Sequence, residues 1–279
     1  MTRIFDFNLQ VQDRLATVAS IRALKETDEK MVEVTATSAE DAIAAEAAGI
    51  EMVVADPECV ADVREGSKRL FLTSAIDFVP HPPVTEDEVL RAAMTALENG
   101  ADAVHTCRRP QTIRRLADEK IPVMCHVGFV PRQSNLLGGI RCVGKTAEEA
   151  LRIFDEIRRL EDAGAFAVEC ELVASEMMSE ITKRTGMATI SLGSGIDGDI
   201  IGLFTSDICR EHSNVPRHAR VYADLLALKE KMQREKHRAL AEFAGDVRNR
   251  QYPGEAEIVH TTEDEVERFV ELIEGKRPA

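Results

Sequence analysis

Residues 121–139, IPVMCHVGFVPRQSNLLGG, carry the pattern on which the fold assignment depends. The stretch begins as a short apolar run that contains His126, continues as a polar loop and ends at Gly138 and Gly139. Parallel strands are buried on both faces, so they appear in a sequence as nearly continuous apolar runs. Barrels of alternating strands and helices carry their active sites on the loops that follow the strands. The stretch therefore predicts a buried parallel strand that leads into a functional loop.

The same unit recurs along the chain. Helix starts are marked by Ser38, Thr85 and Thr146, each followed by acidic residues of the first turn. Strands are expected at residues 30–35, 50–55, 70–76, 103–107, 122–127, 166–171, 188–192 and 200–205. Alternating strands and helices predict a parallel sheet, and eight such units in 279 residues favour a closed (β/α)₈ barrel. No GxGxxG motif follows the first strand, which argues against a dinucleotide-binding open sheet.

We expect one domain, a TIM-type (β/α)₈ barrel that spans residues 1–279, with residues 215–279 as a C-terminal helical extension. Within this extension, residues 221–242 are expected to form a long helix whose apolar stripe serves packing. Residues 263–273 are expected to form an acidic helix at the periphery. The extension is thus predicted to support the barrel rather than to carry chemistry.

Composition restricts the classes of function. A hydrophobic content of 44% and a charged content of 30% are typical of a soluble globular protein. The net charge of −14 argues against nucleic acid or an anionic membrane as a partner, because both require a positive surface. The N-terminus is charged and no long apolar window occurs, so neither a signal peptide nor a membrane span is expected. The six cysteines are scattered without a CxxC pair, which indicates reduced thiols and a cytoplasmic location.

Polar side chains stand where the predicted strands end. They are Asp56, Asp77, His105 with Cys107, His126, Glu171 and Ser194. Because the C-terminal ends of barrel strands meet at one rim, we expect three carboxylates, two histidines and a thiol to converge there. This convergence is the main argument from the residues alone for an active site.

The two aspartates are candidate metal ligands. Asp56 and Asp77 would supply hard oxygen atoms to a divalent cation, with Mg²⁺ as the favoured ion. Cys107 is expected on the same side of its strand as His105, and its thiol would shift the preference toward Zn²⁺. The alternatives are that Asp56 begins a turn with Pro57, that Asp77 caps a helix, and that Cys107 is a core residue.

Glu171 is the candidate general base. It ends an apolar strand, and burial would raise the pKa of its carboxyl group into a range useful for proton transfer. Glu169 lies two residues earlier on the same face and is a candidate structural partner. His126, taken alone, is more often a core histidine than a catalyst. Ser194 lies between two glycines, in a segment whose backbone N–H groups are candidates for binding an anionic substrate group.

These segments, in this order, resemble the ketopantoate (3-methyl-2-oxobutanoate) hydroxymethyltransferase family over about residues 20–260. The most specific part, residues 121–150, is similar to the family's HLGLTPQSVN, Gly-Gly and QGK motifs. Supporting segments are LEDAGAFAVECELV, ITKRTGMATISLGSG and YPGEAEIVH. The resemblance implies a barrel of the phosphoenolpyruvate mutase and isocitrate lyase type. It also implies a cytoplasmic homo-oligomer, often a decamer, that acts in pantothenate biosynthesis.

The resemblance further implies a mechanism. A divalent metal holds a 2-oxo acid, 3-methyl-2-oxobutanoate in this family, and polarises its ketone. A carboxylate removes the neighbouring proton, and the enolate attacks the methylene group of 5,10-methylenetetrahydrofolate. On the matching positions, Asp56 and Asp77 would hold the metal, Glu171 would be the base, and His126 would be the histidine of the HLGL motif.

Three positions depart from the family pattern. Pro57 stands where a serine contacts substrate, His105 where a lysine holds the substrate carboxylate, and Cys107 where a carboxylate lies near the metal. We therefore expect His105, Ser194 and Pro57 at the substrate and Cys107 beside the metal. Two alternatives follow from these departures. One is a C–C lyase or aldolase that acts on another 2-oxo acid, and the other is a barrel that has lost catalysis and only binds.

Overall fold

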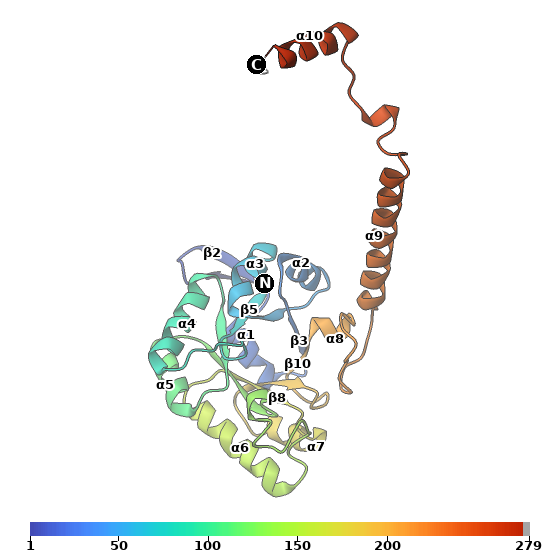
Figure 1. Ribbon diagram of the computed structural model, residues 1–279. Helices are drawn as coiled ribbons and strands as arrows, with labels where there is room; N and C mark the ends of the chain where they lie inside the picture. The colour runs from blue at the N-terminus through green and yellow to red at the C-terminus, as the bar shows by residue number, and fades with distance from the viewer. Residues whose placement is uncertain (276–279) are drawn as a thin grey trace. The chain divides into compact units, whose positions relative to one another are not determined.

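A closed barrel of parallel strands forms the centre of the molecule in the computed structural model, which describes residues 1–275 (Figure 1). Eight strands of the described chain close in the order β10-β3-β4-β5-β6-β7-β8-β9. Their bounds are β3 (Met31–Thr35), β4 (Met52–Ala55), β5 (Phe71–Ala75), β6 (Ala103–Thr106), β7 (Val123–Gly128), β8 (Ala167–Glu171), β9 (Ala188–Leu192) and β10 (Ile200–Leu203). The predicted (β/α)₈ barrel is confirmed, and each strand lies within a predicted strand except for the last residue of β7.

Helices follow most of the strands and cover the outside of the barrel (Figure 1). They are α1 (Val18–Ala23), α2 (Ala39–Ala47), α3 (Val60–Gly66), α4 (Glu86–Glu98), α5 (Pro110–Asp118), α6 (Ala147–Asp162), α7 (Ser175–Thr182) and α8 (Thr205–Ile208). The predicted caps are present. Thr85 Oγ1 accepts a hydrogen bond from the Glu88 N–H, and Glu88 accepts one from the Thr85 N–H. Ser38 and Thr146 also cap their helices.

Several elements, among them helix α8, were not anticipated from the sequence. An antiparallel hairpin of β1 (Thr2–Phe5) and β2 (Val11–Arg14) precedes the barrel, and helix α3 follows β4. Short 3₁₀ helices also occur: η1 (Leu24–Glu26), η2 (Pro57–Cys59), η3 (Pro131–Gln133) and η4 (Glu255–Glu257). The hairpin is polar and largely exposed, so it lacks the apolar alternation by which a strand is recognised.

The barrel interior is apolar at one end and polar at the other. Successive residues of a strand point to opposite faces, so alternate positions enter the barrel. At the start of the strands these positions carry apolar groups such as Met52, Phe71, Met124 and Ile190, which pack into one cluster with Phe166. The outward-facing positions pack against the helices in a separate cluster. Because apolar groups fill the N-terminal half of the barrel, space for a ligand remains at the C-terminal ends of the strands.

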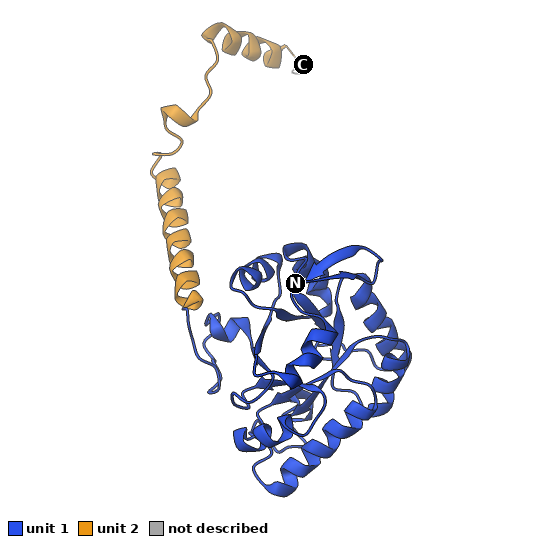
Figure 2. Cartoon of the chain, turned by 180° about the vertical axis from the view of Figure 1, so that it is seen from behind, with its two compact units in different colours: residues 1–223 blue, residues 224–279 orange. Residues whose placement is uncertain are grey.

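The chain divides into two compact units, residues 1–223 and residues 224 onward (Figure 2). The second unit contains the predicted long helix, observed as α9 (Leu225–Arg248), and the predicted acidic helix, observed as α10 (Glu263–Glu274). Leu228, Met232 and Leu240 of the predicted packing stripe are exposed. Residues 276–279 of the predicted extension lie outside the described range. Among the described helices, none is both long and apolar enough to cross a membrane.

Candidate active site

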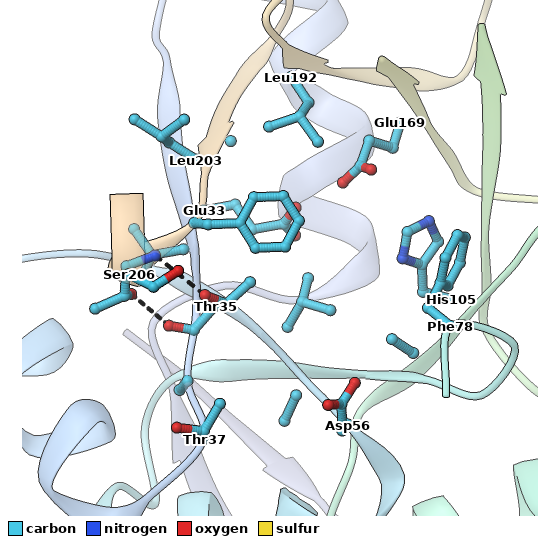
Figure 3. Close-up of a pocket in the computed structure, with 18 of the residues that line it drawn as sticks. Glu33, Thr35, Thr37, Asp56, Phe78, His105, Glu169, Leu192, Leu203 and Ser206 are labelled. Atoms are coloured by element: carbon cyan, nitrogen blue, oxygen red, sulfur yellow. Dashed lines mark hydrogen bonds between the residues drawn. The ribbon is translucent and has the colours of Figure 1, made fainter. Parts of the chain in front are cut away.

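A cavity of about 430 Å³ opens at the C-terminal ends of the barrel strands (Figure 3). The strands β3, β6, β7 and β8 each place an inward-facing polar side chain in its lining. These side chains are Glu33, Thr35, His105, His126, Glu169 and Glu171. Asp56, Phe78, Leu192, Leu203 and Ser206 complete much of the wall. The cavity therefore combines titratable groups with apolar walls, which is typical of a small-molecule site.

His126 lies between two carboxylates. In the register of β7 and β8, His126 pairs with Glu169 and Gly128 pairs with Glu171, so strand pairing holds the three side chains together. His126 Nδ1 is 3.0 Å from Glu169 Oε1, and His126 Nε2 is 3.2 Å from Glu171 Oε2 and 3.0 Å from the Phe129 carbonyl oxygen. Among the described residues Nδ1 has no partner in good hydrogen-bond geometry, so its contact with Glu169 is an ion pair.

These contacts set the charge of His126. Burial disfavours the imidazolium, but the carboxylates of Glu169 and Glu171 outweigh this effect and raise the pKa of His126 to about 10. In the absence of other ligands, His126 is therefore a cation at neutral pH. The prediction that this histidine belongs to the active-site rim is consistent with its place in the cavity wall.

His105 is a neutral imidazole beside His126. The two rings stack with centroids 5.5 Å apart, and Phe78 stacks on His105 at 4.8 Å. Burial lowers the pKa of His105 to about 4, so the ring carries no charge at neutral pH. His105 Nε2 has no hydrogen-bond partner among the described residues. A buried nitrogen without a partner is uncommon and indicates a place for a ligand.

Two further glutamates in the cavity differ in charge. Burial, and then the charge of Glu169, raises the pKa of Glu33 well above its ordinary value. Burial also acts to raise the pKa of Glu169, but His126 and His105 outweigh it and lower that pKa. Burial thus favours the protonated form of Glu33, and the two histidines favour the carboxylate form of Glu169. Pairs of carboxyl groups with separated pKa values are common where proton transfer occurs.

The predicted aspartates do not share one site. Asp56 lies in the cavity wall, where burial and then Glu58 raise the pKa of its carboxyl group. Asp77 is 1% exposed, and its Oδ1 accepts a hydrogen bond from Arg108 Nε at 2.8 Å. Its Oδ2 accepts from Thr106 Oγ1 and from the Cys107 N–H. Both oxygens of Asp77 are therefore occupied by protein donors.

Cys107 and the remaining predicted residues lie outside this cavity. Strand β6 ends at Thr106, so Cys107 follows the strand, and it is absent from the lining of the main cavity that contains His105. Cys107 lines a second cavity of about 400 Å³ with Asp77 and Arg108, and burial raises the pKa of its thiol to about 11. Pro57 begins η2 outside the main cavity.

The hydroxyl group of Ser194 forms hydrogen bonds with the backbone. Its hydroxyl accepts a hydrogen bond from the Val173 N–H at 2.8 Å and donates one to the Cys170 carbonyl oxygen at 2.7 Å. It is 1% exposed and joins the ends of β8 and β9. The structure gives this side chain a positioning contact between strands, with no oxygen directed into the cavity lining.

Glu33 was missed in the sequence analysis. A signal was present, because Glu33 interrupts the apolar strand residues Met31, Val32 and Val34. A carboxylate on the inward face of a barrel strand has no water to solvate it and therefore marks a site. The cluster His105, His126 and Glu169 was also not recognised as a group, although its ligand atoms all lie within 4.8 Å of one another.

Fold and cavity together define a (β/α)₈ barrel with acid–base groups at the C-terminal rim. The profile of the ketopantoate hydroxymethyltransferase family matches residues 57–255. A 3-methyl-2-oxobutanoate hydroxymethyltransferase of Hyperthermus butylicus is 33% identical over 92% of this chain and 95% of its own. One from Phenylobacterium zucineum is 38% identical over 70% of each chain. This chain belongs to the ketopantoate hydroxymethyltransferase family, a family of enzymes.

Solved structures support the fold alone. The carboxyl transferase domain of Rhizobium etli pyruvate carboxylase, determined with pyruvate, superposes with a TM-score of 0.51 at 13% identity. The match covers 68% of this chain and 42% of that chain. Sequence identity at this level carries no information about substrate.

Proposed function

We propose that this chain transfers a hydroxymethyl group to a 2-oxo acid through an enolate. By family membership the acceptor is 3-methyl-2-oxobutanoate and the donor is 5,10-methylenetetrahydrofolate. The observation that carries the proposal is the contact between Glu171 and His126 in the cavity at the strand ends. Assembly as a cytoplasmic homo-oligomer, a decamer by resemblance, and a role in pantothenate biosynthesis belong to the same proposal and rest on the family.

Glu171 is the base in this scheme. Its carboxylate faces the cavity and takes the proton from the carbon beside the ketone, and the electron pair of that C–H bond moves to the ketone oxygen. His126 Nε2 lies 3.2 Å from Glu171 Oε2 and contacts this carboxylate before the transfer. His126 also holds the carboxylate in one orientation, because its other nitrogen is fixed against Glu169.

The second step forms the new C–C bond. The enolate carbon bonds to the methylene carbon of the donor, and the bonds from that carbon to the folate nitrogens break. Overall, the acceptor exchanges one hydrogen for a CH₂OH group, and water supplies the hydroxyl oxygen. The two remaining hydrogens appear on the nitrogens of tetrahydrofolate, so atoms balance. Glu33 lies in the same wall, and burial raises its pKa, so it would supply a proton to the departing nitrogen.

A divalent ion, when bound, would polarise the ketone and stabilise the enolate oxygen. The predicted pair of ligands fits such an ion poorly as arranged here. Asp56 offers a carboxylate to the cavity, but both oxygens of Asp77 already accept hydrogen bonds from protein groups. Cys107 belongs to the neighbouring cavity and retains its proton. The role of Glu171 as the base does not depend on which residues hold the ion.

A second candidate is a C–C lyase that acts on another 2-oxo acid, because the position of the family's carboxylate-binding lysine holds His105, whose burial lowers its pKa to about 4. The residues that line the cavity within the described chain include no lysine or arginine. The carboxyl groups in the lining are Glu33, Asp41, Asp56, Glu169, Glu171 and Glu211. A substrate carboxylate therefore meets only His126 as a fixed cation. Cleavage by the reverse of the same enolate chemistry would use the same base and proton donor.

Proton exchange distinguishes these candidates. We would incubate the full chain with a panel of 2-oxo acids in D₂O, with divalent ions added, and follow loss of the C3 proton signal by NMR. The transferase predicts exchange of 3-methyl-2-oxobutanoate and, once 5,10-methylenetetrahydrofolate is added, formation of ketopantoate. The lyase predicts exchange of a different 2-oxo acid and no ketopantoate. Absence of exchange with every acid in the panel would reject both.

A further inference from the structure

Two buried polar atoms in the cavity lack partners. His105 Nε2 and Glu33 Oε2 have no hydrogen-bond partner among the described residues. The two residues are 4% and 2% exposed, so bulk water does not solvate them. Leaving such an atom unsatisfied costs about 1–3 kcal/mol. Two such atoms in the wall of one cavity indicate that a ligand occupies this place when the protein is active.

We infer that His105, His126 and Glu169 form a binding site for a divalent transition-metal ion, with Glu33 beside it. The residues come from β6, β7 and β8, three adjacent strands of the barrel, at positions that all face inward. The labelled side chains of His105, Glu169 and Glu33 border the same space in Figure 3. Rigid strands hold ligands more reproducibly than loops do.

The distances are close to those of a bound site. The ligand atoms of the three residues lie within 4.8 Å of one another. Ligands of a tetrahedral ion with bonds of about 2.1 Å stand roughly 3.4 Å apart. Side-chain rotations that move the outermost atoms inward by about 1 Å therefore suffice. His126 Nδ1 and Glu169 Oε1 already lie 3.0 Å apart, so this pair needs little movement. The ion would take the place of the proton on Nδ1, because a histidine ligand binds a metal through an unprotonated nitrogen.

The donor atoms specify the class of ion. Two imidazole nitrogens and a carboxylate oxygen suit zinc, iron or cobalt, whereas Mg²⁺ prefers an all-oxygen environment that retains water. The cluster also carries the negative charge that a cation needs, from Glu169 itself and from Glu171 on the far side of His126. The pair Asp56 and Asp77 is the other candidate ligand set, but both oxygens of Asp77 accept hydrogen bonds from protein groups.

This inference deepens the proposed function and relies on it only for what the ion does during the reaction. The binding itself stands on the residues of the cavity. A metal site without exchange activity would leave the inference intact and overturn the proposed function. Exchange activity without a metal at these residues would overturn the inference and leave the proposed function intact.

Cobalt offers a direct probe. The full chain, freed of metal by a chelator, is titrated with Co²⁺ while visible absorption is recorded. We expect about one equivalent to bind and to produce the bands of a nitrogen-ligated ion. Zn²⁺ should displace the Co²⁺, and excess Mg²⁺ should not. The variants His105→Asn and Glu169→Gln should each bind more than about 100-fold more weakly, beyond the roughly 10–100-fold effect of losing an outer-shell partner.

Two control variants locate the ion. His81→Asn makes the same change at an exposed histidine outside the cavity and should bind Co²⁺ like the unaltered chain. Asp56→Asn should also retain binding, because Asp56 is not one of the three ligands. Loss of binding in Asp56→Asn with retention in His105→Asn would overturn the inference, as would the absence of any Co²⁺ or Zn²⁺ binding.

A measurement on the unaltered chain covers the case in which a variant does not fold. X-ray absorption of the protein loaded with one equivalent of Zn²⁺ should show two imidazole ligands. A shell made of oxygen ligands alone would contradict the site, whatever the variants do.

Discussion

Both ends of the barrel bury ionisable side chains, but they differ in how completely the polar atoms of these side chains are paired. At the N-terminal end, Arg14, Arg64 and Asp102 form an ion network that is almost fully enclosed. At the C-terminal end, the cavity contains His105, His126 and several carboxyl groups. Both regions bury ionisable groups within the same small domain. They differ in how many of the polar atoms have partners.

In the N-terminal network, the polar atoms of Asp102 and the arginines are paired. Asp102 accepts hydrogen bonds from Arg14 Nε at 2.8 Å, from Arg64 at 2.8 Å and from the Leu72 N–H at 2.9 Å. Arg64 also donates to the carbonyl oxygens of Gly100, Ser67 and Leu70. In the cavity, by contrast, His105 Nε2 and Glu33 Oε2 have no partner among the described residues. The paired charges of this network support the scaffold, and the two unpaired atoms of the cavity remain available to a ligand.

The largest effect is expected at the saturated end. Asp102→Ala leaves two buried guanidinium groups without their carboxylate, and we expect a loss of about 3–5 kcal/mol in the free energy of unfolding. Urea denaturation measures it. Asp13→Ala is the matched control, because Asp13 contacts Arg3 in an exposed pair at 3.7 Å and should cost less than about 1 kcal/mol. If Asp102→Ala lowered the free energy of unfolding no more than the control does, the buried network would contribute no more to stability than an exposed ion pair.

A second prediction concerns Ser194, which lies between the scaffold and the cavity. Its hydroxyl joins the Val173 N–H to the Cys170 carbonyl oxygen close to the cavity. Ser194→Ala should lower the free energy of unfolding by about 1–3 kcal/mol, because a buried donor and acceptor lose their partner. Ser213→Ala, at an exposed position, should change it by less than about 0.5 kcal/mol. If the two variants were equally stable, the hydrogen bonds of Ser194 would not contribute to the stability of the fold.

A smaller effect, dependent on pH, is expected at Glu33. Burial, and then Glu169, raises the pKa of Glu33 in the folded state above its ordinary value of 4.5. Between these two pKa values the folded chain holds a proton that the unfolded chain has lost. This group therefore makes the free energy of unfolding fall as pH rises, by at most about 1.4 kcal/mol per pH unit.

Glu33→Gln removes that titration. The variant should gain stability relative to the unaltered chain as pH rises from below to above 4.5, the ordinary pKa of the group, in chelator-treated protein studied by urea denaturation. The advantage should be smallest at the acidic end, where Glu33 is protonated in both states. Parallel stability curves for the two proteins would mean that Glu33 is not held in its protonated form.

Much of the barrel followed from local sequence rules. Apolar runs such as residues 123–127 and capping residues such as Thr85 and Thr146 report on nearest neighbours in the chain, so they identified the strands and most helices. The hairpin β1–β2 was not predicted, because its exposed strands lack an apolar face. Register and closure depend on contacts between distant residues, which periodicity does not report.

The location of the site could be predicted from the sequence, but the set of residues that form it could be predicted only in part. Asp56, His105, His126 and Glu171 all line the cavity, as expected from residues at strand ends. Asp77 was expected at the same rim, but its neighbours Arg108 and Thr106 bind both of its oxygens. Such partners are set by side-chain directions after the strand ends, and they are invisible in a linear sequence. The contact between His126 and Glu169 likewise depends on the register of β7 and β8.

The central claim is that the unsaturated end of the barrel forms enolates with Glu171 as the base. The most direct test is the rate of deuterium incorporation at C3 of 3-methyl-2-oxobutanoate in D₂O, compared between the unaltered chain and Glu171→Gln. We predict a rate roughly 10²–10⁴-fold lower in the variant. Glu176→Gln, a nearby exposed position in α7, should exchange at the unaltered rate. Exchange at the unaltered rate in Glu171→Gln would contradict the account.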